Sequence, residues 1–191
     1  MISIRLADWR DRTEVQSLRR LVCPVEGGLY ELLKWPIYHV HTARKDGVTI
    51  GYTSVCLSPD GMADDAGTYV TENPKVVLPI LRRVQVRDLS VMGWKYLFVT
   101  VPFNLTGLHN TLFGHAPLAE FPDGSLYYGA AIEVLQSRMQ AAGIPDPLPL
   151  SVKQIEFLQY KASRVVDFTA QLNSLYQLTA QKAQAVKEYI G

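Results

Sequence analysis

The segment Gly67–Pro102 constrains the fold more than any other part of the sequence, because it is typical of a strand, a helix and a second strand in succession. The run KYLFVTV, residues 95–101, is almost entirely apolar, as expected of a strand buried in the middle of a sheet. The helix expected over Val76–Val91 ends at Gly93. Its candidate core residues are Val77, Leu81, Val84 and Leu89. This segment predicts an α/β fold.

Other stretches add strands and helices around this unit. Ile2, Ile4 and Leu6 alternate with polar residues, as in a half-buried strand. Two β-rich runs flank Asp46-Gly47, the pair preferred in a tight type I′ hairpin turn, and a second hairpin is expected around residues 122–124. Helices are expected over residues 12–22, 29–35, 106–113 and 133–142, and the polar stretch 58–67 is expected to be a loop. Residues 1–142 therefore predict a mixed central sheet of about six to seven strands with flanking helices.

The last part of the chain is expected to be a long helical extension. Residues 143–150 contain three prolines and predict a linker, and Ser151 and Gln154 form a capping box for the helix that follows. From residue 155 onward, apolar and small residues recur at alternating steps of three and four, as in a coiled coil or a long packed helix over residues 151–191. The positions expected to contact another chain are Ile155, Leu158, Val165, Leu172, Tyr176, Val186 and Ile190.

Two readings of this extension stay open. It either folds over the sheet of its own chain or pairs with other protein chains in a homo- or hetero-oligomer, and the second reading is favoured because exposed apolar stripes of this size are usually covered.

Bulk composition excludes several classes of protein. The net charge is +1, from 19 basic and 18 acidic residues, which does not suggest a nucleic-acid partner. Two cysteines do not make a disulfide framework and fit a reducing interior. We expect no signal peptide, because the N-terminus has charges from residue 5 onward and no apolar h-region. We expect no membrane span, because the sequence has no 18-residue apolar run. The expected location is the cytoplasm, or a virion if the protein is of phage origin.

The order of elements over residues 2 to about 132 resembles that of the GNAT acetyltransferase superfamily. The resemblance depends on the hairpin HTARKDGVTIGYTSV, on the strand–helix–strand segment described above, and on Asn104 just after it. It implies that the turn before the helix would hold the acetyl-CoA pyrophosphate. In the family this turn resembles Arg/Gln-x-x-Gly-x-Gly/Ala, whose main-chain N–H groups and following helix dipole favour phosphate.

This chain departs from that pattern, because the turn reads Glu72, Asn73, Pro74, Lys75. Glu72 places a negative charge near the expected phosphates, and Pro74 has no N–H to donate. Each lost donor to a charged oxygen weakens binding by roughly 1.5–3 kcal/mol. Two or three such losses imply roughly a thousandfold or more in affinity, so neither a cofactor nor a catalytic residue is favoured.

The favoured interpretation is a non-catalytic structural or assembly protein with a GNAT-like domain and a helical tail for protein contact. It is loosely similar to GNAT-like virion-associated proteins of short-tailed bacteriophages. The alternative is an acetyl-CoA-dependent N-acetyltransferase with an atypical cofactor loop. For that alternative the resemblance implies Val70, Thr71, Lys75 and Asn104 as cofactor-binding residues, and Asn104 and His109 as catalytic ones. His109 would act as general acid, unless it is an exposed helical residue.

Two further clusters have simple interpretations. His39 and His41 lie two apart on one strand, so they face the same way, and two imidazoles can bind a metal. No third ligand stands out, so we expect an exposed position on the hairpin and no metal. Arg82, Arg83 and Arg87 are expected on the solvent face of the long helix.

Overall fold

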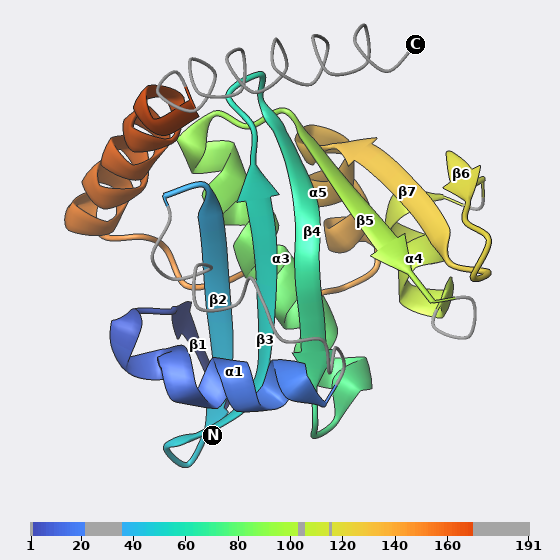
Figure 1. Ribbon diagram of the computed structural model, residues 1–191, viewed down its shortest axis with the longest axis horizontal. Helices are drawn as coiled ribbons and strands as arrows, with labels where there is room; N and C mark the ends of the chain where they lie inside the picture. The colour runs from blue at the N-terminus through green and yellow to red at the C-terminus, as the bar shows by residue number, and fades with distance from the viewer. Residues whose placement is uncertain (1, 22–35, 103–105, 115, 170–191) are drawn as a thin grey trace, which may run out of the picture.

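The computed structural model describes residues 2–21, 36–102, 106–114 and 116–169. Its strands form one seven-stranded sheet with the order β1-β2-β3-β4-β5-β7-β6, and this order can be followed from left to right in Figure 1. All neighbouring strands are antiparallel except β4 and β5, which run parallel. The mixed sheet with flanking helices confirms the predicted fold class. The helix expected over residues 29–35 lies outside the described residues.

The elements have the following bounds. The strands are β1 (Ile2–Leu6), β2 (Tyr38–Lys45), β3 (Val48–Leu57), β4 (Met62–Val70), β5 (Tyr96–Val101), β6 (Ala119–Glu120) and β7 (Leu126–Ala131). The helices are the short 3-10 helix η1 (Trp9–Asp11), α1 (Arg12–Arg20), α3 (Pro74–Met92), α4 (Thr106–Phe113) and α5 (Ile132–Ala141). A further helix spans residues 152–169.

The β2–β3 hairpin has the turn that the sequence predicts. Asp46 and Gly47 both have positive φ angles, 50° and 85°, as a type I′ turn requires. The loop predicted over residues 58–67 is wrong in its second half, because β4 already begins at Met62. Polar side chains do not prevent a strand here, since the main chain of β4 is paired with β3 on one side over most of its length.

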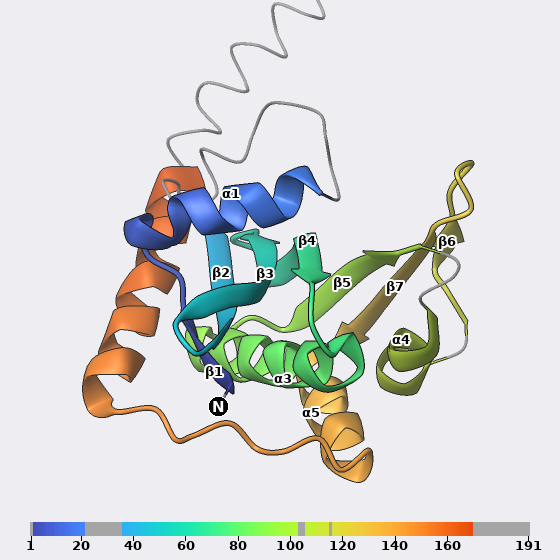
Figure 2. The same cartoon turned by 90° about the horizontal axis from the view of Figure 1, so that it is seen from below.

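Helices cover the sheet unequally on its two faces. Figure 2 shows α1 on one face, over β2, β3 and β4, with α3, α4 and α5 on the other. The long helix α3 contributes the fully buried Val77, Leu81 and Leu89 and ends at Gly93, which has a φ of 85°. The core therefore lies mainly between the sheet and α3, α4 and α5.

Residues 143–151 form neither helix nor strand and lead to the helix over 152–169, which lies beside β2 (Figure 1). The capping box is present, because the Gln154 N–H donates to Ser151 Oγ and the Ser151 N–H donates to Gln154 Oε1. Arg83 and Arg87 of α3 hold the connecting segment through the Asp146 carboxylate and the Leu148 carbonyl oxygen.

The helix over 152–169 packs against its own domain. Leu158 and Val165 are 2% and 0% exposed, and both belong to the main core cluster. The sequence analysis expected these two side chains to contact another chain, but the structure gives them a place in the chain's own core. Ile155 is partly buried, and Leu172, Tyr176, Val186 and Ile190 lie outside the described residues. In the part of the chain that the structure describes, no helix is long and apolar enough to cross a bilayer.

Candidate functional site

Strands β4 and β5 separate partway along their length. Their pairing is limited to Met62 with Tyr96, Ala63 with Leu97, and Asp64 with Phe98. Beyond that point β4 continues to Val70 and β5 to Val101, and Figure 1 shows the two strands diverging. This V-shaped opening has its apex at Asp64 and Phe98, and α3 begins at its wide end.

The N-terminus of α3, called its head below, comprises residues 73–76 and lies just after the end of β4. Asn73 has a φ of 48° and so adopts the left-handed conformation that glycine usually fills. Pro74 is the first helical residue and lacks an N–H, and the Val76 N–H already donates to the Asn73 carbonyl oxygen at 2.9 Å. The head of this helix therefore offers fewer main-chain donors than an ordinary helix N-terminus.

The charge of Glu72 is locally balanced. Lys45 of β2 donates to the Glu72 carboxylate at 2.7 Å, and both side chains are more than two-fifths exposed. This contact was not visible in the sequence, and it reduces the repulsion that Glu72 alone would exert on a phosphate. What sets this helix start apart is therefore its missing main-chain donors rather than an unbalanced acidic charge.

No protein-family model matches the chain, and no curated protein matches its sequence. Solved structures do match. A ribosomal-protein alanine N-acetyltransferase from Escherichia coli has a TM-score of 0.57 and 12% identity, over 69% of this chain and 94% of that one. An acetyltransferase of the GNAT family from Staphylococcus aureus has a TM-score of 0.55 and 8% identity, over 69% of this chain and 99% of that one. An IAA acetyltransferase from Bacillus cereus has a TM-score of 0.54 and 15% identity over the same shares. This chain has a GNAT-like fold.

At these identities the likeness establishes the fold alone. The match spans nearly the full length of the three solved structures but leaves about a third of this chain without a counterpart in them.

Of the residues that the resemblance implied for a cofactor, Val70, Thr71 and Lys75 lie near the opening but are not all turned toward it. The Thr71 N–H and hydroxyl both donate to the Ile50 carbonyl oxygen of β3, at 2.8 and 3.0 Å. Main-chain groups alternate along a strand, so Val70 presents its own N–H to the opposite edge, where β5 has separated. Lys75 is exposed on the first turn of α3. Asn104 lies outside the described residues.

His109 is buried rather than exposed. Its side chain is 6% exposed and its ring stacks on Phe113, with centroids 6.2 Å apart. The alternative in which His109 is an exposed helical residue is therefore wrong, because α4 turns this side chain toward the core, where Phe113 also contacts Tyr128.

A polar pair that no local sequence pattern indicates lies at the apex of the V. Tyr127 of β7 donates its hydroxyl proton to Asp64 Oδ2 at 3.2 Å, and the Tyr127 ring stacks on Phe98 with centroids 5.7 Å apart. Burial raises the pKa of the Asp64 carboxyl, and neighbouring Asp65 adds to that effect. Asp64 and Tyr127 are 63 residues apart, so only the sheet register brings them together.

A buried polar cluster lies between β2 and α3. His39 and His41 are 0% and 1% exposed and contact Asp88 Oδ2 through their Nε2 atoms, at 3.3 and 2.8 Å. Burial, with the nearby charge of Lys161, lowers the pKa of His39 to about 3, so this ring is neutral at pH 7. Burial alone would raise the pKa of Asp88, but hydrogen bonds from both imidazoles pull that pKa below its usual value.

The exposed position predicted for the two histidines is therefore wrong, because α3 covers this face of the hairpin. The prediction that Arg82 and Arg83 lie on the solvent face of α3 is also wrong, since these side chains are only 1% and 8% exposed. Arg82 makes a buried ion pair with Asp65 of β4 at 2.8 Å and donates to Gln85 at 2.7 Å.

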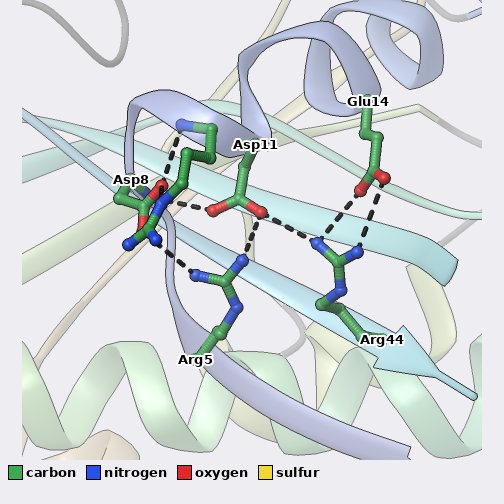
Figure 3. Close-up of a pocket in the computed structure, with 6 residues that line it drawn as sticks. Arg5, Asp8, Asp11, Glu14 and Arg44 are labelled. Atoms are coloured by element: carbon green, nitrogen blue, oxygen red, sulfur yellow. Dashed lines mark hydrogen bonds and ion pairs between the residues drawn. The ribbon is translucent and has the colours of Figure 1, made fainter. Parts of the chain in front are cut away.

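A charged hollow of roughly 340 Å³ lies between β1, β2 and the start of α1 (Figure 3). It is lined by three arginines and three acidic residues: Arg5, Arg10, Arg44, Asp8, Asp11 and Glu14. The buried Asp11 carboxylate accepts from Arg5 at 2.5 Å and from Arg44 at 2.9 Å. The charges are balanced and paired with one another, so this network ties α1 to the sheet rather than preparing a site for a charged ligand.

Proposed function

We propose that this chain is a non-catalytic assembly protein, in which a GNAT-like domain carries a helical extension for contact with other protein chains. The proposal depends chiefly on one observation, the poor set of main-chain donors at the head of α3. Pro74 supplies no N–H, and the N–H of Val76 is engaged within the helix.

The expected effect on cofactor binding follows from these two groups. Each donor to a charged oxygen contributes about 1.5–3 kcal/mol, so two losses amount to about 3–6 kcal/mol. That loss corresponds to about a hundredfold to ten-thousandfold weaker binding of a diphosphate. The residues present therefore do not fit the acetyl-CoA pyrophosphate, and we derive no chemical step through that cofactor.

The helix over 152–169 supports the assembly role through its outer surface. Phe157, Tyr160 and Val166 are each at least half exposed, on a helix whose opposite side is buried in the domain. Aromatic side chains such as those of Phe157 and Tyr160 are enriched where protein chains meet. The setting that we propose is an assembled particle, such as the virion of a short-tailed bacteriophage.

A thermal-shift assay with acetyl-CoA, combined with light scattering of the full chain, tests this proposal. A ligand present at about 100 times its dissociation constant stabilises a protein by about 2.7 kcal/mol. We expect no upward shift at millimolar acetyl-CoA, together with a mass in solution above the 21.4 kDa of one chain. A clear upward shift and a monomeric mass would contradict the proposal.

The second candidate is an N-acetyltransferase, which the pair Asp64 and Tyr127 favours. A carboxyl whose pKa is raised, at the apex of the opening, is suited to accept a proton from an amine. Amine-dependent release of CoA, lost in Asp64→Asn and retained in Asp60→Asn on the exposed β3–β4 turn, would establish this candidate in place of the first.

A further inference from the structure

The cluster of His39, His41 and Asp88 places three potential metal ligands together in the interior. Their ligating atoms all lie within 4.8 Å of one another, and all three residues are buried. The two histidines come from alternate positions of β2, and Asp88 comes from the facing side of α3. The sequence analysis found no third ligand because Asp88 is 47 residues from His41 and meets it only through the packing of α3.

The distances suit a transition metal. Ligand atoms about 2.0–2.1 Å from a tetrahedral Zn²⁺ lie about 3.3 Å apart. Asp88 Oδ2 lies 3.3 Å from His39 Nε2, which matches, and 2.8 Å from His41 Nε2, which needs to widen by about half an ångström. The ligating atoms of the two imidazoles, which lie within 4.8 Å of each other, need to reach the same separation of about 3.3 Å. Both Nε2 atoms face the same Asp88 oxygen, and the two rings meet edge to face with centroids 4.6 Å apart.

The other oxygen of Asp88 is already positioned by a neighbour. Arg87 donates from Nε to Asp88 Oδ1 at 2.8 Å, and its Nη2 lies 2.6 Å from the same oxygen. This leaves Oδ2 as the oxygen that both imidazoles face. A carboxylate ligand held in this way by a hydrogen bond on its second oxygen is common around protein metal centres.

We propose that His39, His41 and Asp88 form a binding site for a divalent transition-metal ion, with Zn²⁺ as the best match. Two imidazoles and one carboxylate suit zinc and its neighbours, whereas Mg²⁺ and Ca²⁺ prefer oxygen ligands throughout. Neutral imidazoles and an ionised carboxylate are the forms in which these residue types bind a metal. An ion here would join β2 to α3.

Two features set the expected strength of this site. Lys161 Nζ donates to the carbonyl oxygen of Tyr38, the residue before His39, at 2.6 Å, so its positive charge lies near the site and would repel a metal ion. The Nδ1 atoms of both rings lack a hydrogen-bond partner within the part of the chain that the structure describes, so the usual support for a metal-bound imidazole is missing. We therefore expect micromolar affinity, and we expect Lys161→Met to strengthen binding.

Titration of the chelator-treated full chain with Zn²⁺ by calorimetry, and with Co²⁺ by visible absorption, tests the proposal. The wild-type chain is expected to bind one ion and to give the absorption of four-coordinate Co²⁺. Asp88→Asn and His41→Gln, each checked for folding by circular dichroism, should lose at least tenfold in affinity. His109→Gln, which changes a buried histidine elsewhere, should bind as the wild type does.

The variant Lys161→Met distinguishes two interpretations of the cluster, a metal-binding site and a set of purely structural contacts. Removal of a structural contact leaves metal affinity unchanged, whereas removal of a repelling charge raises it. Absence of binding at millimolar Zn²⁺, or equal binding by the wild type and both folded ligand variants, would overturn the proposal.

Discussion

The place of Leu158 in the core gives the sharpest test of how the C-terminal extension is used. Leu158 is 2% exposed within the main core cluster, whereas its neighbour Phe157 is 50% exposed on the same helix. Truncation of a buried leucine to alanine costs about 2–5 kcal/mol, and a helix at the edge of the domain can relax in part, so we expect about 3 kcal/mol for Leu158→Ala. In a chain of this size that corresponds to a fall in Tm of about 6–12 °C.

Urea unfolding of the full chain, followed by circular dichroism at two protein concentrations tenfold apart, measures this loss. Leu158→Ala should lose the same free energy of unfolding at both concentrations, because the contact lies within one chain. The matched variant Val152→Ala, at a position that is 70% exposed at the start of the same helix, should change the free energy by less than about 1 kcal/mol. If Leu158→Ala unfolds like the wild type, or its effect shrinks with dilution, Leu158 contacts another chain and our reasoning is wrong.

Three further predictions follow from the buried groups and from β7. Asp65→Ala should lose about 3–5 kcal/mol in urea unfolding, since it leaves the buried Arg82 without its partner, and adding Arg82→Met should restore most of that loss. Burial lowers the pKa of Lys161 from its usual 10.5 to about 8. Above pH 10.5 this amine is neutral in both the folded and the unfolded chain, so its burial does not reduce the free energy of unfolding. That advantage is lost as the pH falls from 10.5 to 8, because the unfolded chain takes up a proton there first. The wild type should therefore gain up to about 3 kcal/mol relative to Lys161→Met between pH 8 and 10.5, and parallel stability curves would refute this. Gly129→Ala should cost about 1–3 kcal/mol, because the new Cβ would lie 2.5 Å from the Phe98 ring. Its control is Gly107→Ala, which has open space in helix α4 and should not destabilise the chain.

Local patterns in the sequence predicted the elements well where the local signal was strong. Asp46-Gly47 identified its hairpin turn, and Gly93 identified the end of α3. The strand β4 was predicted too short, because Asp64 and Asp65 look like loop residues unless their partners Tyr127 and Arg82 are known. A contact between two side chains that are far apart in the sequence leaves no pattern in the local sequence around either residue.

The same limit explains the errors on burial. His39 and His41 are polar residues on a hairpin, and their burial depends on Asp88, which only the packing of α3 brings to them. The periodicity of the extension was predicted correctly at Leu158 and Val165, but periodicity identifies an apolar face without identifying what covers it.

The central claim is that the head of α3 does not hold a diphosphate, and calorimetric titration of the full chain with CoA tests it most directly. We predict no measurable heat of binding below about 1 mM, and we predict that the double variant Glu72→Gly with Pro74→Gly binds CoA at least tenfold more tightly than the wild type. Micromolar binding of CoA by the wild type, abolished by Lys75→Glu at the same turn, would contradict the account and favour the acetyltransferase.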